Sequence, residues 1–169
     1  FVSVASPTTG IPRPRHNLPA QTTAFIGREN ELAELYDLLT EPDCRLVTIT
    51  GPGGVGKTRL AIEAAREQVN TFSDGIVFVP LAPVTMRESM ILRISDALGT
   101  ALYPQGSIGP EQQLLTYLGQ KRLLLVLDNL EHLIEACDLV VAILEETPNT
   151  KVLVTSRERL NIRGEWILE

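Results

Sequence analysis

The sequence lacks several features that mark whole classes of protein. Its 169 residues include two cysteines, Cys44 and Cys137, which lie far apart and outside any CxxC pattern. This usage favours reduced thiols in a cytosolic protein over a disulfide framework or a cysteine zinc site. The net charge is -6, whereas a general nucleic-acid binder usually carries a basic surface. No apolar run approaches the roughly 18–20 residues that span a bilayer.

The start of the chain also lacks targeting signals. FVSVASPTTG has neither a basic head with a long apolar stretch nor an initiator methionine. We therefore expect a fragment or a processed product of a cytoplasmic protein. Hydrophobic residues at 44% and charged residues at 21% fit one soluble domain with a sizeable core.

Residues 1–24 are rich in proline, threonine and serine. Proline on this scale prevents a helix and donates no hydrogen bond to a sheet. We interpret 1–24 as a linker or arm, with the domain proper at 25–169. Contact with an acidic partner is the alternative use of its small basic patch, which comprises Arg13, Arg15 and His16.

From residue 25 onward, helical and strand patterns alternate. Apolar runs predict strands at 45–50, 75–82, 121–129 and 151–156, and WILE at 166–169 has the texture of a further strand. Helical spacing predicts helices at about 29–40, 58–69, 87–99, 110–119 and 130–147. This alternation predicts the α/β class, with a mostly parallel sheet covered on both faces. Such sheets bind ligands at the edge where the strand carboxyl ends meet.

A glycine-rich loop lies at that edge. GPGGVGKT, residues 51–58, follows a strand and opens a helix, so it matches the P-loop pattern GxxxxGK[ST] in its proper context. Glycines let successive N–H groups surround an anion, and the helix adds its positive N-terminus. Lys57 can reach β- and γ-phosphates, and the Thr58 hydroxyl can ligate Mg²⁺. The predicted phosphate-binding residues are Gly51, Gly53, Gly54, Val55, Gly56, Lys57, Thr58 and Arg59.

A second group of candidates follows the apolar strand RLLLVLD. Asp128 can support Mg²⁺ directly or through water; capping of the next helix is the alternative. Many nucleotide-hydrolysing enzymes carry a second acid at the next position, where this chain has Asn129. Two interpretations of Glu131 stay open: a residue that swings toward the γ-phosphate, or a helix N-terminal acid favoured by the dipole.

A third group follows the strand KVLV. Arg157 is placed to bridge phosphate oxygens and to report whether a γ-phosphate is present. A surface arginine is the alternative, and Arg159 competes for the same role. Upstream, residues 27–29 (Gly-Arg-Glu) read by themselves as a turn and a helix start.

The ordered set FIGRENEL, GPGGVGKT, LLLVLDNLEHL and VLVTSRERL resembles the nucleotide-binding domain of STAND-class signal-transduction ATPases. The resemblance is to the NB-ARC/AP-ATPase branch of large bacterial regulators, including those of LuxR type, and covers about 25–169. It implies a three-layer P-loop NTPase sandwich of the additional-strand type, with about five parallel strands in the order 2-3-4-1-5. It implies ATP/ADP and Mg²⁺ as cofactors, Asp128 as the metal acid and Arg157 as a sensor. The implied base-side contacts are Phe25, Ile26, Gly27 and Arg28.

The implied function is a nucleotide switch, with ADP bound at rest and ATP bound during signalling. Hydrolysis is expected to be slow because Asn129 replaces the second acid; the catalytic candidates are Lys57, Asp128, Glu131 and Arg157. The implied partners are helical, winged-helix and sensor-repeat regions of the same polypeptide and a second copy in the ATP state, without nucleic-acid or membrane contact. The alternatives are an AAA+-type motor ATPase acting on DNA or protein, and a small-molecule kinase, although 100–110 lacks the arginine of a kinase lid.

Overall fold

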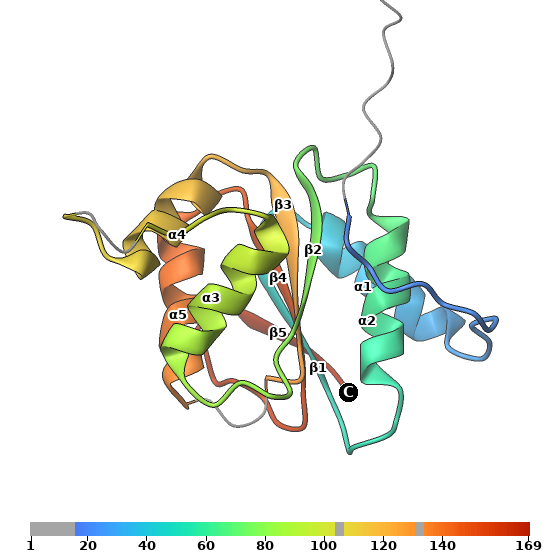
Figure 1. Cartoon of the computed structure of the whole chain (residues 1–169). Coiled ribbons are helices and arrows are strands. Elements are labelled where there is room, and N and C mark those ends of the chain that lie inside the picture. The colour runs from blue at the N-terminus through green and yellow to red at the C-terminus, as the bar shows by residue number, and fades with distance from the viewer. Residues whose placement is uncertain (1–15, 104–106, 131–133) are drawn as a thin grey trace, which may run out of the picture.

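The computed structural model describes residues 16–103, 107–130 and 134–169 (Figure 1). A five-stranded sheet forms its centre, with the order β2-β3-β4-β1-β5. All neighbouring strands are parallel, so the fold prediction, including the strand order, is confirmed. The strands are β1 (Leu46–Thr50), β2 (Gly75–Pro80), β3 (Leu123–Asp128), β4 (Lys151–Ser156) and β5 (Glu165–Leu168).

The central strands are continuously apolar because both faces of the sheet are covered. Side chains alternate along β3: Leu124 and Val126 enter the core beneath one helical layer, and Leu125 and Leu127 enter the core beneath the other. Asp128 ends this strand and is only half-buried. The apolar run therefore stops at the sheet edge where the glycine loop begins.

Two helical layers flank the sheet (Figure 1). The first holds α1 (Glu29–Thr40) and α2 (Lys57–Glu67), and the second holds α3 (Arg87–Leu98), α4 (Pro110–Gly119) and α5 (Ile134–Glu146). Helix α3 ends at Leu98 and is capped by Gly99, whose left-handed φ of 67° agrees with the glycine cap that the sequence predicts. Helix α2 ends two residues before its predicted end, and β2 stops at Pro80. Among the described helices, none is long and apolar enough to cross a membrane.

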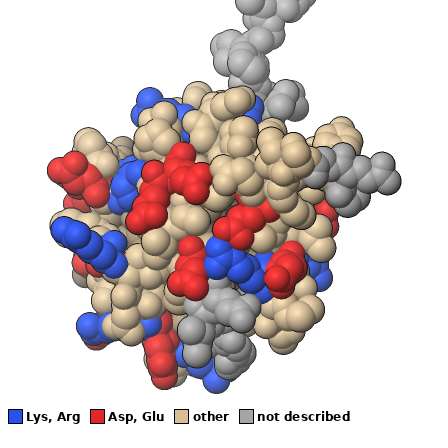
Figure 2. All heavy atoms as spheres, turned by 90° about the vertical axis from the view of Figure 1, so that its left-hand side faces the viewer, with Lys and Arg blue, Asp and Glu red and all other residues tan. Residues whose placement is uncertain are grey.

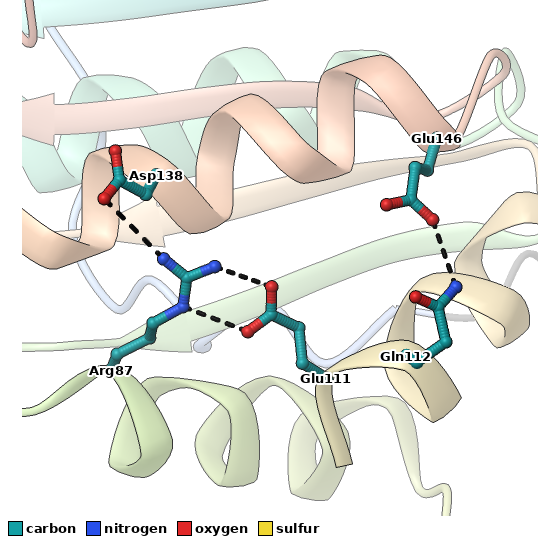
Figure 3. Close-up of polar contacts among 5 residues, drawn as sticks. All are labelled: Arg87, Glu111, Gln112, Asp138 and Glu146. Carbon is teal, nitrogen blue, oxygen red and sulfur yellow. Dashed lines mark hydrogen bonds and ion pairs between the residues drawn. The ribbon is translucent and has the colours of Figure 1, made fainter. Parts of the chain in front are cut away.

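Charged side chains join the helices of the second layer (Figure 3). Arg87 of α3 donates to both carboxylate oxygens of Glu111 on α4, at 3.0 and 2.6 Å, and lies 3.9 Å from Asp138 of α5. Gln112 of α4 donates to Glu146 of α5 at 3.1 Å. Figure 2 shows acidic and basic side chains interspersed over this face. The three helices are thus connected by polar contacts at the surface as well as by packing in the core.

Residues 16–24 lie against the first layer. His16 forms a parallel bridge with Ile76 of β2, and Leu18 is buried in the core. The Asn17 side chain accepts from the Phe78 N–H at 2.6 Å and donates to the Phe78 carbonyl at 2.9 Å. The blue segment in Figure 1 then crosses α2. Contacts with the domain therefore begin before residue 25; the assignment of 1–24 as a linker stays a prediction.

Cations satisfy backbone carbonyls at the amino end of the sheet. Arg45, just before β1, donates to the carbonyls of Thr147 and Thr150 at 2.6–2.9 Å. Lys151 at the start of β4 donates to the carbonyls of Leu39 and Glu41, at the end of α1. Burial lowers the pKa of both cations. These hydrogen bonds connect β1 and β4 to the neighbouring chain segments at the end of the sheet opposite the glycine loop.

Candidate functional site

The glycine loop joins β1 to α2 at the carboxyl edge of the sheet. Gly54 and Gly56 have φ values of 78° and 92°, where residues with a Cβ are strained. A Cβ on either glycine would have no neighbouring atom within 4 Å, so backbone conformation rather than space requires glycine there. Gly56 is also the residue before the first turn of α2. The loop therefore presents backbone N–H groups and a helix N-terminus to the same point.

Lys57 is the buried cation of this loop. Its side chain is 8% exposed, and its ammonium donates to the carbonyls of Gly51 at 2.7 Å and Pro52 at 3.0 Å. A buried ammonium needs such acceptors because desolvation without them is costly. The contacts hold the ammonium at the mouth of the loop.

Asp128 and Thr58 meet beside the loop. The Thr58 hydroxyl donates to Asp128 Oδ1 at 2.6 Å, although the two residues come from α2 and β3. The Thr155 hydroxyl, at the end of β4, donates to the same oxygen at 2.7 Å. Thr155 in turn accepts from the Asn129 N–H at 2.8 Å, where Asn129 has a left-handed φ of 65°. Two hydroxyls therefore fix the carboxylate at the end of its strand.

A cavity of about 430 Å³ adjoins this group, and Thr58, Asn129 and Thr155 line it. Two predicted residues, Asp128 and Gly51, are not among its lining residues. Arg157 lines it from the far side of the loop: its guanidinium lies 3.6–3.9 Å from where a Cβ on Gly53 would stand. Arg159 is not among the lining residues. The other lining residues are Gln21, Gly53, Gly54, Gly56, Lys57, Thr58, Arg59, Ile62, Asn129 and Thr155.

A smaller cavity of about 240 Å³ adjoins the first and shares Gly56 and Arg59 with it. Phe25, Ile26 and Arg28 line it, together with Ala24 and Val55. Arg28 donates to the Val55 carbonyl at 2.6 Å and so ties the start of α1 to the glycine loop. Ile26 is 82% exposed and offers an apolar surface at the rim.

Gly27 does not line the smaller cavity, but it shapes the turn before α1. Its φ is 86°, and its N–H donates to the Glu29 carboxylate at 3.1 Å. Hydrogen bonds from the backbone N–H groups of Glu29 and Gly27 lower the pKa of Glu29. In this sequence, Gly27 forms the turn, Arg28 bonds to the glycine loop and Glu29 begins α1.

The structure brings together most of the predicted residues from four separate segments, and their functional roles stay predictions. Glu131 lies outside the described residues. Sequence reasoning missed Gln21, Ala24 and Ile62 as lining residues. It also did not recognise that Thr155 supports Asp128. The position of Thr155, a polar residue at the end of an apolar strand, could have indicated its role. No sequence pattern indicated Gln21, because it lies in the segment interpreted as a linker. Among the described residues, no group of three or more His, Cys, Asp or Glu side chains could hold a metal by itself.

Residues 28–162 match the family model of the NB-ARC domain. The chain belongs to the NB-ARC family. It is therefore a nucleotide-binding module of the P-loop ATPase type, as the four motifs implied. The match includes the glycine loop, Asp128 and Arg157.

Relatives of this NB-ARC domain include longer proteins. An uncharacterised protein of Mycobacterium tuberculosis, Rv0894, is 36% identical over 152 residues, which make up 89% of this chain and 38% of that protein. From the same organism, "Putative HTH-type transcriptional regulator Rv0890c" is 45% identical over 122 residues, covering 72% of this chain and 13% of that protein. The chain thus spans well under half the length of either relative.

Solved structures share the fold at low sequence identity. A STAND protein with a tetratricopeptide repeat sensor from Pyrococcus horikoshii superposes with a TM-score of 0.60 at 15% identity, covering 89% of this chain and 24% of that one. The Drosophila ORC, in a structure bound to DNA, gives a TM-score of 0.59 at 17% identity, covering 85% and 42%. These likenesses concern the fold alone.

Proposed function

We propose that this NB-ARC domain is a Mg²⁺-dependent ATP/ADP switch with slow hydrolysis, within a larger transcriptional regulator. The observation that carries the proposal is the hydrogen bond of 2.6 Å from Thr58 to Asp128, because Thr58 lines one cavity with Lys57 and Arg157. It combines oxygen donors suited to a hard divalent cation with two cations suited to phosphate.

The donor set fits a nucleotide and its metal. Backbone N–H groups of the loop and the amine of Lys57 match the oxygens of a polyphosphate. Arg59 lines both cavities, so its guanidinium is a further cation suited to an anionic oxygen. Phe25 and Ile26 give the adjoining cavity an apolar lining for a base. When bound, Mg²⁺ would neutralise phosphate charge and would be held by Thr58 and Asp128.

Within this proposal, the chain's residues have separate roles. Lys57 exchanges loop carbonyls for phosphate oxygens, and Thr155 keeps Asp128 oriented. Arg157 contacts the γ-phosphate and thereby distinguishes ATP from ADP. Asn129 has no basic group to activate water, which favours retention of the nucleotide over turnover. Glu131 is proposed as the acid that supports slow hydrolysis.

The test is calorimetry with ADP and ATP, with and without Mg²⁺. We expect Lys57→Ala to weaken binding by roughly 10- to 100-fold, because a hydrogen bond to a charged group is worth about 1.5–3 kcal/mol. Single-turnover measurements should show slow ATP hydrolysis. Undiminished ATP affinity in Lys57→Ala would contradict the proposal.

The regulatory part of the proposal is supported by the relative Rv0890c, whose name describes an HTH-type regulator. Helical, winged-helix and sensor-repeat regions would then act as partners within the same polypeptide, and two copies would associate in the ATP state. An AAA+-type motor would instead show rapid ATP turnover stimulated by DNA. Measurement of the ATPase rate with and without duplex DNA separates the two functions.

A further inference from the structure

Residues 16–26, which we call the strap, connect an edge of the sheet to both cavities. At the far end, Asn17 makes its paired hydrogen bonds to Phe78 of β2, and Leu18 is buried. Midway, Arg66 of α2 donates to the Pro19 carbonyl at 3.1 Å. None of these contacts involves a residue that lines a cavity. The far end is thus anchored independently of any ligand.

The near end of the strap forms walls of the cavities. Gln21 lines the larger cavity, and Ala24, Phe25 and Ile26 line the smaller one. The segment is held there by Arg59, whose Nη2 donates to the carbonyls of Thr23 at 2.5 Å and Ala24 at 2.7 Å. The Arg59 guanidinium also lies 5.7 Å from the centre of the Phe25 ring, within cation–π range.

Arg59 is the residue through which the strap and a ligand would communicate. It lines both cavities and directly follows the loop residue Thr58. Its Nη2 is used by the strap, whereas its buried Nε has no hydrogen-bond partner among the residues that the structure describes. A phosphate oxygen that accepted from the part of this guanidinium facing either cavity would fix the same group that holds the strap, since the group is planar and rigid.

We propose that the strap is a movable wall of the nucleotide site and that Arg59 couples its order to nucleotide occupancy. This inference rests on the proposed nucleotide binding. Coupling between two sites is reciprocal: if the nucleotide tightens the strap, the strap must tighten the nucleotide by the same factor. The composition of 1–24 resembles a linker, yet its described part then has a role in ligand retention.

Hydrogen exchange followed by mass spectrometry tests the coupling, with the full chain and ADP–Mg²⁺ as the probe. Peptides from 51–58 report binding, and peptides from 17–26 report the strap. We expect saturating ADP to slow exchange in both segments, by at least about fivefold in the strap, the lower end of usual coupling factors. In Arg59→Ala at saturation, protection of 51–58 should persist while the ADP effect on 17–26 falls below about twofold.

Arg66→Ala is the matched control. Arg66 is an arginine of the same helix and contacts the same strap, but it lines neither cavity. This variant should exchange faster in 17–26 with and without ADP, and it should keep the full ADP effect. The inference is overturned if ADP protects 51–58 and leaves 17–26 unchanged, if Arg59→Ala retains the strap effect, or if Arg66→Ala loses it equally. Failure of ADP to protect either segment would contradict the proposed function itself.

Discussion

At both ends of the sheet, cationic side chains donate hydrogen bonds to backbone carbonyls. At the amino end, Arg45 donates to carbonyls between α5 and β4, and Lys151 donates to carbonyls at the end of α1. At the carboxyl end, Lys57 and Arg59 bind carbonyls of the loop and the strap. The second pair lines a cavity of about 430 Å³, where an anion can compete for the cations. The same kind of contact closes off buried carbonyls at one end, whereas at the other it lies beside a cavity where the proposed nucleotide would replace the carbonyls.

The largest expected effect is a loss of folding stability, without a loss of nucleotide affinity, when Arg45 is replaced. Arg45→Met removes the donors to Thr150, a buried residue, and should lower the free energy of unfolding by about 2–3 kcal/mol. Nucleotide affinity should change little, because Arg45 lies at the opposite end of the sheet. Lys57→Met is the matched variant, with the reverse pattern expected. Urea denaturation and calorimetry on both variants measure the difference, and equal losses of stability would remove the distinction.

The next effect is a pH dependence at the amino end. Burial raises the pKa of the Cys44 thiol to about 11 from an ordinary value of 9.0, with Glu41 adding to the shift and Lys151 opposing it. Between these pH values an unfolded chain loses the proton and the native one keeps it. Stability should therefore fall as pH rises from about 9 to 11, by up to about 2 kcal/mol.

Cys44→Val is the variant that isolates this effect. It should lack the alkaline decline in denaturation curves that the thiol causes. The lowered pKa of Lys151 has the opposite effect on stability. Because the native chain releases this proton at a lower pH than the unfolded chain does, the free energy of unfolding rises with pH. An identical alkaline decline in both proteins would contradict the assignment to Cys44.

At the carboxyl end, Asp128→Asn should separate nucleotide binding from metal binding. Asn keeps an oxygen that can accept from Thr58 and Thr155, but it removes the charge. We expect the enhancement of ADP affinity by Mg²⁺ to fall by about tenfold or more, while metal-free binding stays. Thr155→Ser retains the supporting hydroxyl and is the control. Calorimetry with and without Mg²⁺ measures both, and an unchanged enhancement in Asp128→Asn would exclude its metal role.

The smallest effect concerns cations that pair with carboxylates instead of carbonyls. Arg87→Ala breaks the partly exposed pair with Glu111 in the second helical layer (Figure 3). Because water screens such pairs, the loss of stability should be about 0.5–1 kcal/mol and should shrink in high salt. Nucleotide affinity should be unaffected. Thermal denaturation at low and high salt checks the value.

Much of the fold could be predicted because its signals are local or belong to ordered motifs. Apolar runs and helical spacing located the strands and helices, and Gly99 marked the end of α3. The strand order came from the resemblance, since nothing local in 151–156 shows that β4 lies between β1 and β3. Helix and strand ends shifted by a residue or two, as fraying and capping depend on neighbours.

The site could be predicted only in part. The glycine loop and Asp128 could be located because each follows an apolar strand that is recognisable in the sequence. The hydroxyl of Thr155 supports Asp128 only because the β3–β4 register pairs Leu127 with Val154 and brings the two strand ends together. Asn17 bonds to Phe78, and Gln21 lines a cavity with residues far away in sequence, whereas the prolines around them suggested a linker. Amino-acid composition indicates which local conformations a segment favours, but it does not show which part of the domain the segment packs against.

The left-handed backbone of Asn129 has a consequence for engineering. Such a φ is tolerated by Asn and Asp, whereas most other side chains pay roughly 1–2 kcal/mol for it. Aspartate therefore fits the position with the same shape and the same N–H bond to Thr155, while glutamate would strain it. Under the proposed function, Asn129→Asp supplies the second acid without strain, so one amide group separates retention of the nucleotide from its hydrolysis.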